Sequence, residues 1–81
     1  MKIITEFNGT FINAKSNTGK NGNTYYQMSI DCDGDAGSIS CTEDVYNLCQ
    51  SGEIERFHDY ADVGELNTQY GSFRIRDVKE M

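Results

Sequence analysis

Proline is absent from this 81-residue sequence, and that absence narrows the choice of architecture. Glycine and aromatic residues are frequent instead, with eight glycines, five tyrosines and four phenylalanines. Aromatic residues favour strands and glycine favours tight turns, so the composition predicts strands joined by glycine turns rather than a helical bundle. The length is that of one domain, which we assign to residues 1–81.

Long apolar segments are also missing. No run approaches the roughly 18 apolar residues that suggest a membrane-spanning helix. The opening "MKIITEFNGT" has no apolar stretch like that of a secretory signal peptide. Cys32, Cys41 and Cys49 are odd in number and have no CxxC spacing, which makes a poor disulfide framework. These absences lead us to expect a cytoplasmic protein without a membrane partner.

Positive charge is scarce, since 7 Lys and Arg face 13 Asp and Glu for a net charge of −6. That total alone argues against a polyanionic partner. The distribution is uneven, however. Residues 1–30 hold three lysines and one glutamate (+2), residues 31–65 ten acids and one arginine (−9), and residues 66–81 three bases and two acids (+1). If the two ends lie side by side in the fold, they form a local positive groove.

Five segments have the composition or alternation of strands. They are residues 2–15, 24–31, 38–41, 53–66 and 72–80. In the first segment, the isolated Gly9 predicts a bulge at which the inward positions switch from Ile3 and Phe7 to Ile12 and Ala14.

Alternation assigns the side chains of the other strands to the core or to the surface. The predicted inward residues are Tyr26, Met28, Ile30, Phe57, Ala61, Val63, Phe73 and Ile75. The predicted outward residues are Tyr25, Gln27, Ser29, Tyr60, Ser72, Arg74 and Arg76.

Residues 42–52 change to a helical period. Thr42 is a good N-cap and Gly52 a good C-cap. The apolar face of this helix is formed by Val45, Leu48 and Cys49. Five strands with one short helix between strands three and four match the OB-fold, so we expect an all-β protein with a small Greek-key barrel.

Two outward aromatic residues are accompanied by cations. Tyr25 follows the loop that contains Lys20, and Tyr70 precedes the strand that carries Arg74. Lys15 ends the first strand. Rings that stack on bases and cations that contact phosphates are the components of a surface for single-stranded nucleic acid. The alternative is that both tyrosines are surface residues that pack on a neighbouring strand.

Three passages resemble a known family: "GNTYYQM" after the Gly/Lys loop, "YADVGEL" and "QYGSFRI". From about residue 15 to the end, the sequence resembles the small single-stranded-DNA-binding, or helix-destabilising, proteins of filamentous phages and related OB-fold binders of phages and plasmids. The resemblance implies that Tyr25 and Tyr70 stack on bases and that Lys15 and Lys20 contact phosphate. It also implies a two-fold dimer that coats single strands cooperatively.

The chain departs from that family in its acidic middle third and at Asp77, near which the family has a basic residue. Arg74 and Arg76 can substitute for it. We therefore expect a non-catalytic homodimer that binds single-stranded DNA with little sequence preference in phage- or plasmid-type DNA replication, with RNA as a possible ligand. The expected nucleic-acid-binding residues are Lys15, Lys20, Tyr25, Tyr60, Tyr70, Arg74 and Arg76.

Other constellations lack the spacing that their chemistry needs. Asp31, Asp33 and Asp35 resemble the start of a calcium loop, but Ala36 and Thr42 stand where that loop needs Gly and Glu. The residue types of a zinc site are present without a recognised spacing, in Cys32, Cys41, Cys49 and His58. His58 has no adjacent serine nucleophile, and a surface ion pair with Asp59 is the simpler interpretation. We expect no enzyme activity, cofactor or small-molecule substrate.

A second hypothesis fits the acidic charge directly. Small OB-type barrels also bind proteins, and an acidic surface suits a basic partner or imitates DNA. The chain would then be an adaptor or a DNA-mimic inhibitor.

Overall fold

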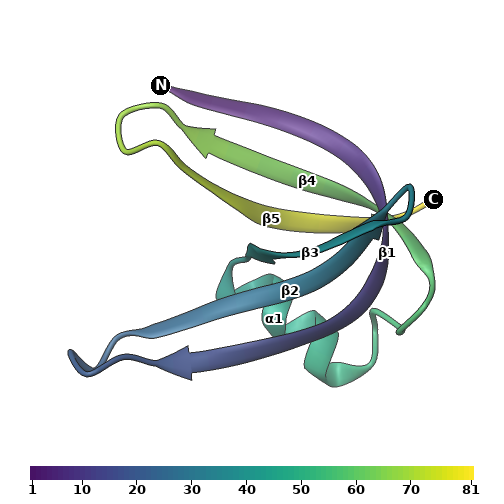
Figure 1. The fold of residues 1–81 in the computed structure, drawn as a ribbon, viewed down its shortest axis with the longest axis horizontal. Helices are drawn as coiled ribbons and strands as arrows, with labels where there is room; N and C mark the ends of the chain where they lie inside the picture. The colour runs from purple at the N-terminus through teal and green to yellow at the C-terminus, as the bar shows by residue number, and fades with distance from the viewer.

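The computed structural model shows residues 1–81 as one five-stranded sheet with a single helix (Figure 1). The elements are β1 (Lys2–Thr18), β2 (Thr24–Cys32), β3 (Asp35–Ser40), α1 (Glu43–Ser51), β4 (Asp59–Asn67) and β5 (Ser72–Glu80). The order across the sheet is β3-β2-β1-β4-β5, and all neighbours are antiparallel. This confirms a mostly-β fold of five strands with one short helix after the third. The helix is neither long nor apolar enough to cross a membrane.

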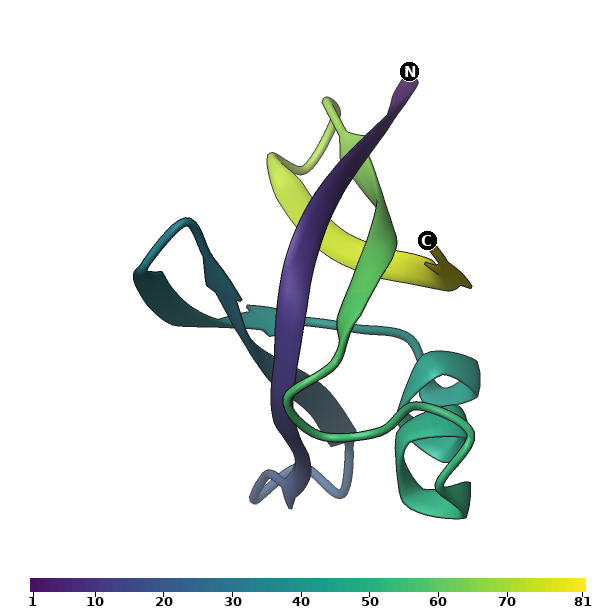
Figure 2. The same ribbon diagram turned by 90° about the vertical axis from the view of Figure 1, so that its right-hand side faces the viewer.

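β1 is shared by the two halves of the sheet and runs the full height of the molecule in Figure 2, with α1 on one side and the β2–β3 turn on the other. Its first part pairs with β4 and its last part with β2, and the two pairings meet at Thr10. The register to β2 shifts between Phe11 and Asn13, which makes Ile12 the bulged residue. The predicted bulge at Gly9 was therefore wrong.

The inward residues of β1 also differ from the prediction. Phe11 is fully buried and Phe7 and Ala14 pack against the core, whereas Ile3 is exposed. Glycine at position 9 is explained by close packing instead, because a Cβ there would lie only 3.0 Å from Asp62 Oδ2.

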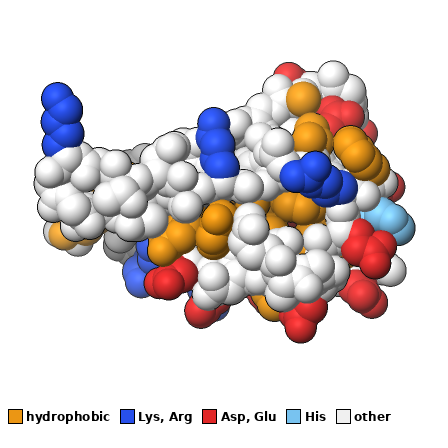
Figure 3. All heavy atoms as spheres, turned by 90° about the horizontal axis from the view of Figure 1, so that it is seen from below, with side chains coloured by type: hydrophobic (Ala, Val, Ile, Leu, Met, Phe, Trp, Pro, Cys, Tyr) orange, Lys and Arg blue, Asp and Glu red, His pale blue; other side chains and the backbone are white.

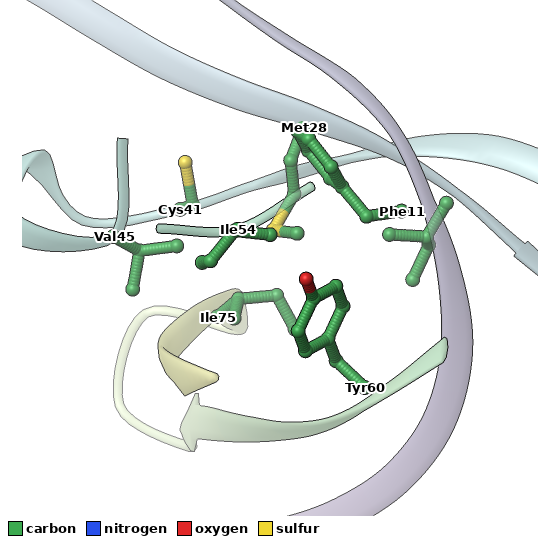
Figure 4. Packing of buried hydrophobic residues seen from close by; sticks show 8 residues of the cluster. Phe11, Met28, Cys41, Val45, Ile54, Tyr60 and Ile75 are labelled. Carbon is green, nitrogen blue, oxygen red and sulfur yellow. The ribbon is translucent and has the colours of Figure 1, made fainter. Parts of the chain in front are cut away.

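One apolar cluster holds the sheet, the helix and the following loop together (Figure 4). It consists of Phe11, Met28, Ile30, Cys41, Val45, Ile54, Tyr60 and Ile75. The predicted inward positions of β2, α1 and β5 are confirmed: Met28, Ile30, Val45 and Ile75 are buried, and Tyr26, Leu48, Cys49 and Phe73 pack against them.

The helix follows directly from local signals. The Thr42 hydroxyl accepts a hydrogen bond from the Val45 N–H at 3.3 Å, and Gly52 ends the helix with a φ of 86°. Just before the cap, Cys41 and Ile75 form a parallel bridge, and the Thr42 N–H donates to the Ile75 carbonyl at 3.0 Å. This bridge brings the end of β3 against β5, although these strands are the two outermost in the sheet order.

β4 begins at Asp59, later than the predicted start at residue 53. In the preceding loop Phe57 adopts a φ of 66° and is 74% exposed, so its predicted place in the core was wrong. Ile54 is buried in that core instead. The Phe57 N–H donates to the Phe11 carbonyl at 2.6 Å, and the Phe11 N–H donates to the His58 carbonyl at 3.0 Å. These long-range hydrogen bonds hold the loop in a conformation that the alternation of apolar and polar residues does not predict.

Tyr60 follows that loop and faces the opposite way from the prediction. It is only 7% exposed, and its hydroxyl accepts a hydrogen bond from the Glu55 N–H at 2.8 Å. Figure 4 shows the ring among the core side chains. Tyr60 is therefore a core residue and cannot stack on a base.

Two hairpins project from the same end of the molecule, on the left in Figure 1. We call residues 13–29 the β1–β2 arm and residues 64–76 the β4–β5 arm. The β2–β3 turn and the C-terminus lie at the opposite end.

Candidate nucleic-acid interface

The β1–β2 arm is basic, since it contains two lysines and no acidic residue. Lys15 and Lys20 are exposed, and neither forms an ion pair. Hydrogen bonds within the tip, from the Gly19 N–H to the Asn23 carbonyl (2.8 Å) and from the Gly22 N–H to the Gly19 carbonyl (3.0 Å), give it a defined shape. The φ of 82° at Gly22 requires a residue without a side chain for an unstrained turn. The arm therefore presents Lys20 on an ordered loop.

Tyr25 lies at the base of that tip and is 54% exposed. Its ring packs on Gly19, where a Cβ would lie 3.4 Å from the ring Cε2. The cross-strand partner of Tyr25 is Asn17, and two residues further along each strand Lys15 lies opposite Gln27. Directly opposite residues share a face of the sheet, so Tyr25 and Lys15 both face outward.

The β4–β5 arm presents Tyr70 at its tip, 75% exposed. The turn is closed by the Gly71 N–H, which donates to the Asn67 carbonyl at 2.8 Å. Asn67 Oδ1 also accepts from the Gln69 N–H at 3.0 Å. Gly71 has a φ of 66°, which explains the glycine after Tyr70.

The two arginines of this arm share one acid. Arg74 Nη2 lies 3.8 Å from Glu65 Oε2, and Arg76 Nη1 lies 3.3 Å from Glu65 Oε1. The Glu65 side chain is mostly buried while both guanidinium groups are largely exposed. The trio keeps one net positive charge, so these arginines are weaker cation sites than the sequence suggested.

A polar hollow of about 300 Å³ lies between β3 and the β4–β5 arm. It is lined by Lys2, Ser40, Glu65, Asn67, Ser72, Phe73 and Arg74. Ser40 lies opposite Gln27, and Gln27 lies opposite Lys15. A strip of polar, outward side chains therefore runs from Lys15 on one arm to Arg74 on the other, and the first and last thirds of the chain meet in it.

The structure does not bring Tyr25 and Tyr70 into contact. They stand on different arms, and β2 and β5 are not neighbours in the sheet. Only Tyr26 and Tyr46 form a ring pair, with centroids 4.9 Å apart. A ligand that touches both exposed rings must cross the hollow between the arms.

The opposite end of the molecule is acidic. Two hollows there are lined by acids, one with Asp31, Asp33 and Asp59 and the other with Glu53, Glu55, Asp59 and Glu80. His58 pairs with Glu55 at 3.2 Å rather than with the predicted Asp59. In Figure 3 most acidic side chains in view lie at the right-hand end or along the lower edge, whereas the left-hand tip shows a basic side chain. Acidic side chains are thus concentrated at this end, whereas basic side chains are spread along the molecule.

The cysteines belong to the interior. Burial raises the pKa of Cys41 and of Cys49 to about 11, so both are thiols at neutral pH. Burial, with nearby acids such as Asp62, also raises the pKa of Cys32. No group of three or more His, Cys, Asp or Glu side chains is arranged to hold a metal ion.

Sequence reasoning missed Lys2, Ser40 and Phe73 as residues of the interface. Lys2 reaches the hollow because β1 pairs with β4 in the register that sets it opposite Asn67. Ser40 reaches it through the bridge between Cys41 and Ile75. Both depend on long-range pairing for which the local sequence carries no signal.

Comparison with known proteins adds no assignment, because neither a protein-family model nor a curated protein sequence matches the chain.

Proposed function

We propose that the chain is a non-catalytic OB-fold protein that binds single-stranded DNA with little sequence preference. The bridge between Cys41 and Ile75 supports a closed barrel, because it joins the outermost strands β3 and β5 in the parallel sense. A five-stranded Greek-key barrel, partly open, is the architecture in which this order of elements is known to bind oligonucleotides.

The observation that carries the proposal is the polar strip between the two arms. Exposed aromatic rings stand near both of its ends, Tyr25 on the face of Lys15 and Tyr70 at the tip of the arm that carries Arg74, and no acidic residue other than Glu65 lines the hollow in its middle. Flexible single strands can follow such a strip, whereas the acidic end of the molecule repels phosphate.

The roles follow from the chemistry of each side chain. Tyr25 and Tyr70 stack on bases, which contributes about 1–3 kcal/mol per base and tolerates every base because each has a π-face. Lys15 and Lys20 contact phosphates on the β1–β2 arm. Arg74, with its neighbour Arg76, contacts phosphate on the other arm and exchanges part of its pairing with Glu65 for that contact. Lys2 adds a cation to the hollow.

This function belongs to DNA replication of the phage or plasmid type, in the cytoplasm, and the protein acts as a homodimer. No cofactor takes part. Base stacking and phosphate contacts are common to DNA and RNA, so single-stranded RNA is the natural comparison ligand.

A second candidate function is favoured by one feature of the acidic end. Phe57 is exposed in a backbone conformation that a bulky side chain rarely adopts, and the next residue, His58, lines the acidic hollow. An exposed aromatic residue in an acidic surround suits docking of a basic protein partner.

Titration of the tyrosine fluorescence with oligothymidylate tests the first function. We expect quenching at low salt whose affinity falls steeply as salt rises, because phosphate contacts release counterions. Repeating the titration with oligouridylate measures the preference for DNA. Absence of quenching at low salt would remove the proposal and leave the protein-docking function.

Two substitutions separate stacking from charge. Tyr70→Ala should weaken binding about 5- to 150-fold with an unchanged salt slope, whereas Lys20→Ala should lower the slope by about 0.7. Phe57→Ala and Lys79→Ala, which remove an exposed ring and an exposed cation outside the interface, serve as matched controls. Equal affinities for all four variants would show that the arms are not the binding site.

A further inference from the structure

The N-terminal half of β1 has an unpaired edge. Residues 2–9 pair with β4 on one side, and pairing with β2 on the other side begins only at Thr10. This part of β1 forms the upper border of the molecule in Figure 1. Ile3 and Ile4 are exposed on its two faces. A free edge with exposed apolar side chains is a template for pairing with another strand.

The backbone groups of that edge belong to the even-numbered residues. The Thr68 N–H donates to the Met1 carbonyl, and the Phe11 N–H donates to the His58 carbonyl, so odd-numbered residues face the β4 side. Backbone direction alternates along a strand. Lys2, Ile4 and Glu6 therefore turn their N–H and C=O groups toward the free edge.

We propose that a second copy of this chain pairs antiparallel with this edge, with Ile4 opposite the partner's Ile4. In that register Lys2 lies opposite the partner's Glu6, and Glu6 lies opposite the partner's Lys2. All three pairs join residues whose backbone groups already face the edge. The interface is isologous, as two-fold symmetry requires.

Charge selects this register among those that the backbone allows. A two-fold axis through Glu6 would oppose two glutamates, and an axis through Thr5 would set Ile4 opposite the partner's Glu6. Only the axis at Ile4 sets unlike charges together twice and apolar side chains together once. Lys2 and Glu6 form no ion pair within the chain, so both are available for this contact, and in the dimer Lys2 is paired and is no longer a free cation of the hollow.

The dimer would extend the sheet across the axis as β5-β4-β1-β1-β4-β5. It covers Ile3 and Ile4, the exposed apolar residues of β1. Both β1–β2 arms remain outside the interface, because the pairing uses only the first residues of β1. The inference rests on the homodimer of the proposed function and names its interface, and association can be measured without any nucleic acid.

Sedimentation of the full chain and of charge-reversed variants tests the register. We expect a dimer for the natural sequence and an association constant lowered about tenfold or more in Lys2→Glu and in Glu6→Lys, because each change creates two like-charge pairs. Mixing the two variants should restore the dimer, since one chain then presents acids at positions 2 and 6 and the other presents lysines at both. Lys79→Glu makes the same charge change away from the edge and should leave the dimer intact.

Oxidation of Ile4→Cys provides a second readout, sensitive to a weak dimer. Hydrogen-bonded antiparallel partners lie about 5.5 Å apart at Cα, within the range of a disulfide. We expect a covalent dimer from this variant and none from Lys79→Cys. A monomer without cross-linking would overturn the proposal, and so would a dimer that ignores both charge reversals. Either result leaves the DNA titration untouched.

Discussion

At the scale of single residues, Asp62 is the charged side chain that the fold buries fully, with 1% of its surface exposed. Its Oδ2 has no hydrogen-bond partner. A Cβ at Gly9 would lie 3.0 Å from that oxygen and 3.4 Å from Cys32 Sγ, so the carboxyl group lies beside a thiol. Burial raises the pKa of Asp62 to about 6, because the charged form loses its hydration.

The pH dependence of stability should reveal this group. Its pKa in the folded protein lies above the ordinary value of 3.8, so the folded state binds the proton more tightly. Its contribution to stability is complete below the ordinary pKa and is lost as the pH rises through about 6. Asp62→Asn removes this titration. We expect the variant to gain roughly 2–3 kcal/mol over the natural protein between about pH 4 and pH 8, measured by urea unfolding.

Asp35→Asn is the control for that experiment, since Asp35 is exposed. The free energy of unfolding of this variant should follow that of the natural protein at every pH. If Asp62→Asn, like this control, gains no stability that depends on pH, the Asp62 carboxyl group is solvated in solution.

At the scale of elements, the parts set by local chemistry were predictable from the sequence. The helix was predictable, because its two caps, Thr42 and Gly52, lie close together in the sequence. β5 was predicted to the residue, because Phe73 and Ile75 alternate with polar neighbours. The start of β4 was not predictable, because the hydrogen bonds of Phe11 with Phe57 and His58 join positions far apart in the chain.

The features of the candidate site also divide into those that local sequence predicts and those that depend on strand pairing. Exposed Tyr25 and Tyr70 could be read from turn chemistry and alternation, whereas Tyr60 could not, since β4 is buried at consecutive positions, Tyr60 as well as the predicted inward Ala61 and Val63. The pairing of Arg74 and Arg76 with Glu65 arises from the β4–β5 register. Such cross-strand neighbours are fixed only when the sheet assembles.

The β4–β5 hairpin depends on a glycine that faces an aromatic ring. A Cβ at Gly64 would lie 2.2 Å from Phe73 Cζ, so the ring occupies the space above the glycine. We expect Gly64→Ala to displace Phe73 and to destabilise the protein by about 1–3 kcal/mol. Thermal unfolding measures the loss, and adding Phe73→Leu should recover part of it. A Gly64→Ala variant as stable as the natural protein would mean that the ring moves away at no cost.

At the scale of the whole molecule, the separation of charge decides how a negative protein can bind a negative strand. The molecule is 34 Å long, whereas electrostatic screening at physiological salt acts over about 8 Å. Acids at one end are therefore almost fully screened from phosphates at the other. Local charge between the arms, rather than the net charge of −6, governs binding.

A pair of neutralising substitutions tests this statement. Glu65→Gln frees Arg74 and Arg76, so we expect affinity for oligothymidylate to rise severalfold, roughly 3- to 10-fold, and the salt slope to steepen. Asp33→Asn removes the same charge from the distant end and should leave both quantities unchanged at physiological salt. Equal gains from the two variants would show that net charge controls the interaction.

The bulge at Ile12 sets the register in which β1 pairs with β2 and thereby decides which side chains of the β1–β2 arm face outward. If β1 and β2 paired by one residue out of step, every side chain of the β1–β2 arm would change face, and Lys15 would point toward the interior in place of Ala14. Moving an ammonium group out of water costs several kcal/mol, so the misaligned hairpin is not populated. Lys15, which is assigned to phosphate contact, thus also disfavours the shifted β1–β2 register. Replacing it with an apolar residue would make that register less costly and would also weaken binding.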